Sequence, residues 1–510
     1  MDVSTQDSHE IAPRGAPFPN YARMAFWIAR AGLLGLLLSA CSDHSHSGIT
    51  VDERPVGPVA DVSEEIAGGT GPFVASASPF VAPAGYVERE YVASGTATAY
   101  EPSGELTDDG LWSFEPSTTA AYRTRIVVRR PANAADASGT VLVEWLNVSG
   151  GVDANPDYVM LEEEIIRQGH TWIGVSAQII GVEGGPVIVT APGGEGIAGE
   201  GLKRIDPARY GSLQHPGDGY SFDIFTQVAR AVRHGGALLG GAKPRVVLAV
   251  GESQSAFALT TYYDGVQPLT LAFDGFFVHS RGAPSLPLVG PGEYAALADA
   301  IGGSLRPLFR DDLEAPVVDV QAESDVTGIL GSNAVRQADS DRFRLWEVTG
   351  TAHADTRLLG ANADLLDCGA PINDGPMHLV AKAAFRSLDM WVRTGEPPPL
   401  ASRLELTEGA PPEVRRDGDG IALGGLRTPP VDVPVDVLSG VPGSNPDILC
   451  ILLGSTKPLP DARLAELYPS RGDYVQRYEA ATQRAIDAGL VLEDDRDALL
   501  AFAQPSRIEP

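Results

Sequence analysis

The sequence predicts an α/β fold, with a mostly parallel central sheet, helices on both of its faces, lid-like insertions and a C-terminal extension. Short apolar segments bounded by Gly or Pro alternate with segments of helical periodicity, which is the pattern of strands joined by crossover helices. The most apolar of them, residues 245–250, lies between Pro244 and Gly251 and is apolar at every position after Arg245. Such a run is typical of a central parallel strand that is buried on both faces.

The order of the other elements along the chain favours the same class. Alternating segments predict two half-exposed antiparallel strands, at residues 86–92 and 122–129. Apolar runs predict further strands at residues 140–146, 170–175, 271–278, 316–321 and 343–348. Periodicity and end signals predict helices directly after Ser253 and at residues 156–168, 220–234 and 378–393. Two long irregular stretches, 178–216 and one that ends near Glu314, are expected to be lids or binding loops.

The composition excludes several classes of partner. The formal net charge of −29 argues against binding to nucleic acid and against electrostatic binding to an acidic bilayer. With 510 residues and 43% apolar residues, the chain can bury one large core with insertions. The expected organisation is a signal peptide over residues 1–40, a flexible acidic tether over 41–84, and a catalytic domain with its C-terminal extension over 85–510.

The N-terminus predicts membrane attachment through lipid. Arg30 precedes a short apolar run that ends in Leu38-Ser39-Ala40-Cys41. This pattern is that of a secretory signal and is too short for a membrane-spanning helix. Its end resembles a bacterial lipobox, which would make Cys41 the lipidated first residue of the mature protein. An uncleaved anchor with a chance cysteine is the alternative.

The two other cysteines, Cys368 and Cys450, would then lie in an oxidising compartment. An even pair in that setting suggests one disulfide. Two buried free thiols are the alternative.

The turn after residues 245–250 carries the strongest catalytic signal. Its sequence is Gly251-Glu252-Ser253-Gln254-Ser255, between a predicted strand and a predicted helix. This arrangement resembles the nucleophile elbow of α/β-hydrolases, in which small residues two before and two after the serine prevent a backbone clash. Serine replaces the usual second glycine and is still small. An ordinary loop between a strand and a helix is the alternative.

A serine nucleophile needs a base and a group that orients the base. Residues of both types follow successive predicted strands in the order serine, acid, histidine that this fold uses. The base is His353, which follows strand 343–348; His378 is a weaker rival because no strand precedes it. The acid follows strand 316–321, and Asp325 is favoured over the alternative Glu323.

An acyl-transfer site also needs N–H donors for the oxyanion. One is expected from Gln254, the residue after the nucleophile, and the other from Asn147 or Val148 after strand 140–146. This chemistry needs neither a metal nor an organic cofactor.

Seven short motifs resemble those of a bacterial family called "alpha/beta hydrolase domain", over about residues 84–469. They lie at residues 145–151, 174–178, 206–211, 215–218, 221–225, 251–255 and 427–429. The resemblance implies the α/β-hydrolase fold and a serine-hydrolase site, and it does not specify a substrate.

We therefore expect a lipid-anchored, extracytoplasmic serine hydrolase on the periplasmic or cell-surface side of a bacterial membrane. The most favoured activity is that of a carboxylesterase, which acts on small-molecule esters through an acyl-enzyme on Ser253. The alternatives are an acyltransferase on the same fold and a non-catalytic binding lipoprotein with a hydrolase-like fold.

Overall fold

The computed structural model describes residues 54–76, 82–190 and 192–509, all of which belong to one unit, His46–Pro510. The predicted signal peptide and Cys41 lie outside the described residues. None of the described helices is both long enough and apolar enough to cross a membrane.

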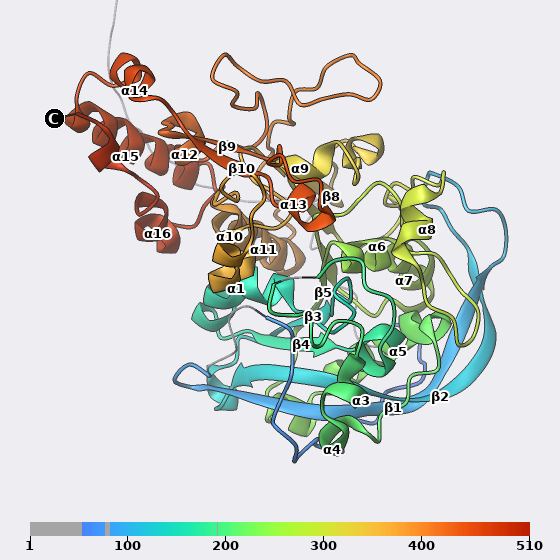
Figure 1. Ribbon diagram of the computed structural model, residues 1–510. Helices are drawn as coiled ribbons and strands as arrows, with labels where there is room; N and C mark the ends of the chain where they lie inside the picture. The colour runs from blue at the N-terminus through green and yellow to red at the C-terminus, as the bar shows by residue number, and fades with distance from the viewer. Residues whose placement is uncertain (1–53, 77–81, 191, 510) are drawn as a thin grey trace, which may run out of the picture. The chain divides into compact units, whose positions relative to one another are not determined.

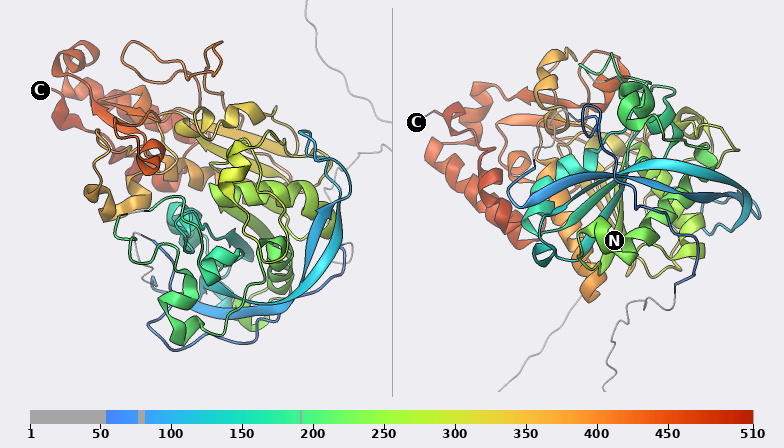
Figure 2. Two further views of the ribbon diagram at one scale, coloured as in Figure 1. Left: turned by 45° about the vertical axis from the view of Figure 1, so that its right-hand side comes forward. Right: turned by 90° about the horizontal axis from the view of Figure 1, so that it is seen from below.

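An eight-stranded sheet forms the centre of the unit, in the order β1-β2-β4-β3-β5-β6-β7-β8 (Figure 1). The first two strands form a long antiparallel hairpin at one edge, β2 pairs antiparallel with β4, and all other pairs are parallel (Figures 1 and 2). The strands are β1 (Tyr86–Pro102), β2 (Phe114–Pro131), β3 (Thr140–Trp145), β4 (Thr171–Val175), β5 (Val246–Glu252), β6 (Gly275–His279), β7 (Val317–Ala322) and β8 (Phe343–Val348). The predicted α/β-hydrolase fold is confirmed.

Helices cover both faces of the sheet, which explains the unbroken apolar runs. In β5, Leu248 packs into a core with α1 (Pro156–Arg167) and α11 (Met377–Thr394). Its neighbour Ala249 points to the opposite core, with α5 (Ser221–His234) and α6 (Gln254–Thr261). The shorter helices of the fold are α2 (Ile179–Glu183), α3 (Gly201–Ile205), α4 (Pro207–Tyr210), α7 (Gln267–Thr270), α8 (Leu297–Gly302), α9 (Glu323–Val326) and α10 (Thr356–Leu359).

Two expectations about local structure need correction. β6 begins at Gly275, four residues later than predicted, because Leu271 adopts a left-handed conformation (φ 46°) that ends α7. The long stretch 178–216 also contains α2, α3 and α4, so that it is not structureless. Apolar residues of this stretch and its neighbours, such as Val182, Leu202 and Tyr210, form a small core of their own, which supports these short helices.

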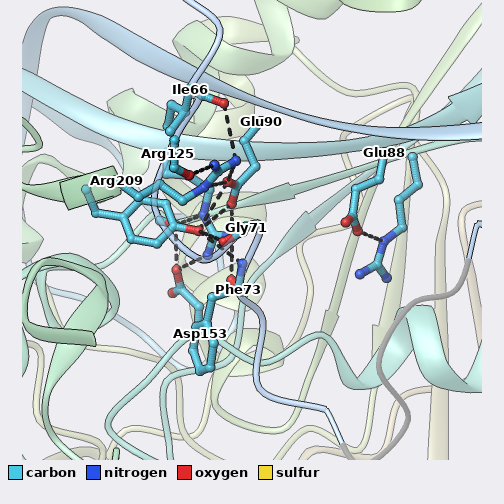
Figure 3. Close-up of polar contacts among 12 residues, drawn as sticks. Ile66, Gly71, Phe73, Glu88, Glu90, Arg125, Asp153 and Arg209 are labelled. Carbon is cyan, nitrogen blue, oxygen red and sulfur yellow. Dashed lines mark hydrogen bonds and ion pairs between the residues drawn. The ribbon is translucent and has the colours of Figure 1, made fainter. Parts of the chain in front are cut away.

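The segment 54–76 was expected to belong to a flexible tether, and this expectation is wrong for these residues. Ala60 and Ile66 are buried, and the backbone of Asp61 and Glu65 pairs with β1. The charged side chain of Arg125, 0% exposed on β2, holds the segment by donating to the carbonyl oxygen of Phe73 at 2.8 Å (Figure 3). Composition alone did not reveal these contacts because the partners lie far along the chain.

The C-terminal extension has a small apolar core of its own, which includes Leu464, Tyr474 and Tyr478. The elements of this extension lie close to one another and are coloured orange to red in Figure 1. Its elements are α12 (Pro429–Asp432), β9 (Asp436–Ser439), α13 (Ile448–Leu452), β10 (Ser455–Pro458), α14 (Asp461–Leu467), α15 (Arg471–Asp487) and α16 (Arg496–Leu500). As predicted, a disulfide joins Cys368 to Cys450 of this extension.

Candidate active site

Ser253 lies on the tight turn between β5 and α6, at the carboxyl edge of the central strand. Its backbone has φ 58° and ψ −123°, a conformation that residues with a side chain rarely adopt. A Cβ on Gly251 would lie 3.0 Å from the Cβ of Ser255, so the turn requires small residues at both positions. The turn leaves Ser253 partly exposed while Gly251, Gln254 and Ser255 around it are buried.

His353 and Asp325 meet Ser253 at the same edge of the sheet. The Nε2 atom of His353 lies 2.8 Å from Oγ of Ser253, and its Nδ1 atom lies 2.8 Å from Oδ1 of Asp325. Asp325 is fully buried, and its second oxygen accepts from the backbone N–H of Ala322 at 2.7 Å. The arrangement fixes the imidazole between a hydroxyl and a carboxylate, as a base that activates a serine requires.

Glu323, the alternative acid, has different partners. Its carboxylate accepts from the backbone N–H groups of Gly350 and Gly440, both at 2.8 Å, and pairs with Arg416 at 2.6 Å. The structure therefore places Asp325, and not Glu323, against the imidazole of His353. The sequence favoured Asp325 but left Glu323 as an alternative, because both acids follow the same strand.

The expected oxyanion donors need one correction. The backbone N–H of Asn147 donates to the carbonyl oxygen of Ala154 at 2.9 Å, and it is therefore already used. The N–H of Val148 faces only the side-chain oxygen of Gln254, at a long 3.4 Å. Gln254 opens α6, so its own N–H is one of those that a helix leaves without an internal partner. Val148 and Gln254 remain as candidate donors.

Side chains that the sequence interpretation did not assign hold these donors. The amide nitrogen of Gln254 donates to the side-chain oxygen of Gln178, which also accepts from the indole N–H of Trp145 at 3.1 Å. Gln178 donates in turn to Asp218 at 3.2 Å. In the sequence, Gln178 and Asp218 stand out because they lie in two of the motifs, 174–178 and 215–218, that resemble the alpha/beta hydrolase domain family.

A group of buried acids lies beneath the serine turn. Glu144 accepts from the first backbone N–H groups of α1, at Asp157 and Tyr158, and Asp157 lies 2.9 Å from Nδ1 of His279. Glu252, next to Ser253, is 3% exposed. Burial, followed by repulsion from Asp157 and Asp325, raises the pKa of Glu252 well above its usual range. Burial likewise raises the pKa of Asp355 to about 6.

The remaining candidates lie elsewhere. His378 is on the first turn of α11 with its ring 6.3 Å from that of Phe502, and burial lowers its pKa to about 4. Within residues 54–76, 82–190 and 192–509, no group of three or more His, Cys, Asp or Glu side chains could hold a metal ion.

Comparisons with known proteins place the chain in a family. No curated protein matches it. Similar solved structures include an esterase of Rhizomucor miehei (11% identity, 61% of this chain and 85% of that chain, TM-score 0.31) and a serine hydrolase without a lid from Xanthomonas campestris (14%, 53% and 90%, TM-score 0.26). These likenesses are too low to carry an argument. The family described as "Alpha/beta hydrolase domain" matches residues 56–501. The chain belongs to this alpha/beta hydrolase domain family.

Proposed function

We propose that the protein is a carboxylesterase that hydrolyses small-molecule esters through an acyl-enzyme on Ser253. The observation that carries this proposal is the unbroken chain from Oγ of Ser253 through the imidazole of His353 to Asp325, with both distances 2.8 Å. The left-handed backbone of Ser253 adds support, because such strain is retained where a side chain must be presented to a reactant.

The first half of the proposed reaction forms the acyl-enzyme. The Oγ of Ser253 attacks the ester carbonyl while its proton moves to Nε2 of His353. Asp325 stabilises the resulting imidazolium. The N–H groups of Gln254 and Val148 receive the negative charge on the carbonyl oxygen, for which the Gln254 side chain must leave the Val148 N–H. The alcohol then departs with the proton from His353, and the acyl group stays on Ser253.

The second half repeats these steps with water. His353 removes a proton from water, the hydroxide attacks the acyl carbon, and the carboxylic acid leaves as the Ser253 Oγ regains a proton from His353. No other reactant is required.

The test is labelling with a fluorophosphonate together with turnover of short chromogenic esters. Ser253→Ala should abolish both, and His353→Ala should reduce turnover by several orders of magnitude because the three residues act as a unit. Asp325→Asn should also cost about 10⁴-fold, through the wrong imidazole tautomer. Ser255→Ala is the matched control on the same turn and should keep labelling. Full activity in Ser253→Ala would reject the mechanism.

We also propose that lipid on Cys41 anchors the protein outside the cytoplasm. The motivation is the apolar run that ends in Leu38-Ser39-Ala40-Cys41. In membrane fractionation, Cys41→Ser should release the protein or block its processing, and Ser42→Ala should behave as the parent does. A Cys41→Ser protein that fractionates and migrates as the parent does would refute the anchor.

A further inference from the structure

Glu323 is a buried carboxylate that the proposed reaction does not use, although it lies two residues from Asp325. It is 1% exposed. One oxygen, Oε1, lies 2.6 Å from Nη2 of Arg416, 2.8 Å from the backbone N of Gly440 and 3.3 Å from Oγ of Ser439. The other, Oε2, accepts from the N–H of Gly350 at 2.8 Å. Every one of these partners donates, so both oxygens of Glu323 act only as acceptors.

Three consecutive side chains hold the short segment that carries the imidazole. Glu323 binds the N–H of Gly350, Ser324 Oγ accepts from the N–H of His353 at 2.7 Å, and Asp325 binds Nδ1 of His353. Gly350 begins the turn of this segment with φ 76°. The first contact fixes where the turn leaves β8, and the last two fix the backbone and the ring of the histidine.

The outer end of Glu323 is held by parts of the chain that lie far from the sheet in sequence. Arg416 belongs to the loop that pairs Leu404 with Gly424, and Gly440 follows β9 of the C-terminal extension. A Cβ at Gly440 would lie 2.4 Å from the N atom of Ser324, so the two segments are in direct contact. A buried carboxylate needs such a cation and such donors to remain charged.

From this geometry we infer that Glu323 is a positioning residue for His353, and that the loop 404–424 and the C-terminal extension complete the active site, through Arg416 and Gly440 respectively. The inference rests on the proposed function. Glu323 touches no reacting atom and acts through the 350–353 segment. Misplacement of a catalytic group by about 1 Å can cost about 100-fold in rate, so the loss of this contact should be visible in turnover.

The test compares Glu323→Gln with Glu347→Gln in the full chain. Glu347 is a matched control because it is also 1% exposed and pairs with an arginine, Arg336, at 2.6 Å, without contact to the 350–353 segment. In Glu323→Gln the amide nitrogen must face a donor, either Gly350 N–H or the Arg416 side. We expect kcat to fall about 10- to 100-fold with little change in KM.

A pH profile separates positioning from simple loss of stability. In Glu323→Gln the acid limb of kcat/KM should move to lower pH, because a displaced His353 meets Asp325 poorly and the imidazolium is less stabilised. In Glu347→Gln both kcat and the acid limb should stay as in the parent, although its melting temperature falls. If Glu323→Gln behaves as Glu347→Gln does, with lower stability alone, the inference is wrong.

A second pair of variants decides the matter if Glu323→Gln does not fold. Arg416 is 23% exposed, so its substitution disturbs less of the core. Arg416→Met should lower kcat with little change in KM, and Arg416→Lys should restore part of kcat. Unchanged kcat in Arg416→Met would overturn the inference. An inactive, unlabelled parent would instead refute the proposed function.

Discussion

Two buried polar clusters show how differently this fold uses charge. The first, called here the Arg125 cluster, consists of Glu90, Arg125, Asp153, Arg209 and Tyr210 (Figure 3). The second, called the elbow acids, consists of Glu144, Asp157, Glu252, His279 and Asp355. In the Arg125 cluster two arginines face two carboxylates. Among the elbow acids there are four carboxyl groups and one histidine, and the imidazole of that histidine contacts only Asp157.

The difference follows the location of each cluster. The Arg125 cluster joins β1 and β2 to the segment 66–73, since Arg209 also donates to the carbonyl oxygens of Ile66 and Gly68. The elbow acids lie beneath Ser253, and Nε2 of His279 has no hydrogen-bond partner in the described part of the chain. The paired charges of the Arg125 cluster stabilise the fold. The elbow acids lack a matching number of cations, so their titration makes both stability and reactivity depend on pH.

The largest effect should come from breaking the Arg125 cluster. Arg125→Met would leave Asp153 buried without its cation and Glu90 with Arg209 alone. Removal of one partner from a buried ion pair costs about 3–5 kcal/mol, so the free energy of unfolding measured with urea should fall by about that amount.

Arg123 provides the control for this prediction on the same strand. Its side chain is 36% exposed and pairs with an exposed Glu64. Arg123→Met should change the free energy of unfolding by about 1 kcal/mol or less. Equal losses in the two variants would mean that burial does not distinguish these ion pairs.

The contrast between local and distant contacts also explains what the sequence could predict. Ser253, Asp325 and His353 each follow a strand, so the order of strands was enough to bring them to one edge of the sheet. The strands themselves could be predicted from unbroken apolar runs, because both faces of the sheet are covered. Such patterns are local, and they survive without any knowledge of the tertiary structure.

The roles of other residues depend on partners far along the chain, which no local pattern reveals. The packing of 54–76 depends on Arg125 and Arg209. The different roles of Asp325 and Glu323 depend on Arg416 and Gly440, which lie 93 and 117 positions after Glu323. The N–H of Asn147 is already hydrogen-bonded, because a turn brings the carbonyl oxygen of Ala154 back to it.

The second prediction removes one of the elbow acids, Asp355. The native protein keeps a proton on this group up to a pKa of about 6, whereas the unfolded chain releases it near 3.8. The native state thus binds more protons between these values, and the free energy of unfolding should fall as pH rises from 4 to above 6, by about 2 kcal/mol from this group.

Asp355→Asn cannot ionise, yet it keeps an acceptor for the backbone N–H of Leu358. The stability of this variant relative to the parent should therefore rise by about 2 kcal/mol from pH 4 to pH 7 in urea titrations. The exposed Asp461 supplies the control, since Asp461→Asn should show no such pH-dependent difference. A constant difference in Asp355→Asn would mean that Asp355 is ionised throughout.

The smallest effect at neutral pH should come from Glu252, although it is adjacent to Ser253. Burial and the neighbouring acids raise the pKa of Glu252 well above its usual range, which favours a neutral carboxyl group of the kind that Gln imitates. Glu252→Gln should thus change kcat/KM at pH 7 by about threefold or less, under 1 kcal/mol in activation free energy. Where a rise in pH ionises Glu252, the parent gains a negative charge on the residue next to Ser253, which opposes the negative charge that develops in the reaction, whereas the variant does not. The ratio of kcat/KM for the variant to that of the parent should therefore rise with pH above neutrality. A flat ratio, or a loss of about 100-fold already at pH 7, would show that Glu252 is charged and takes part in the reaction.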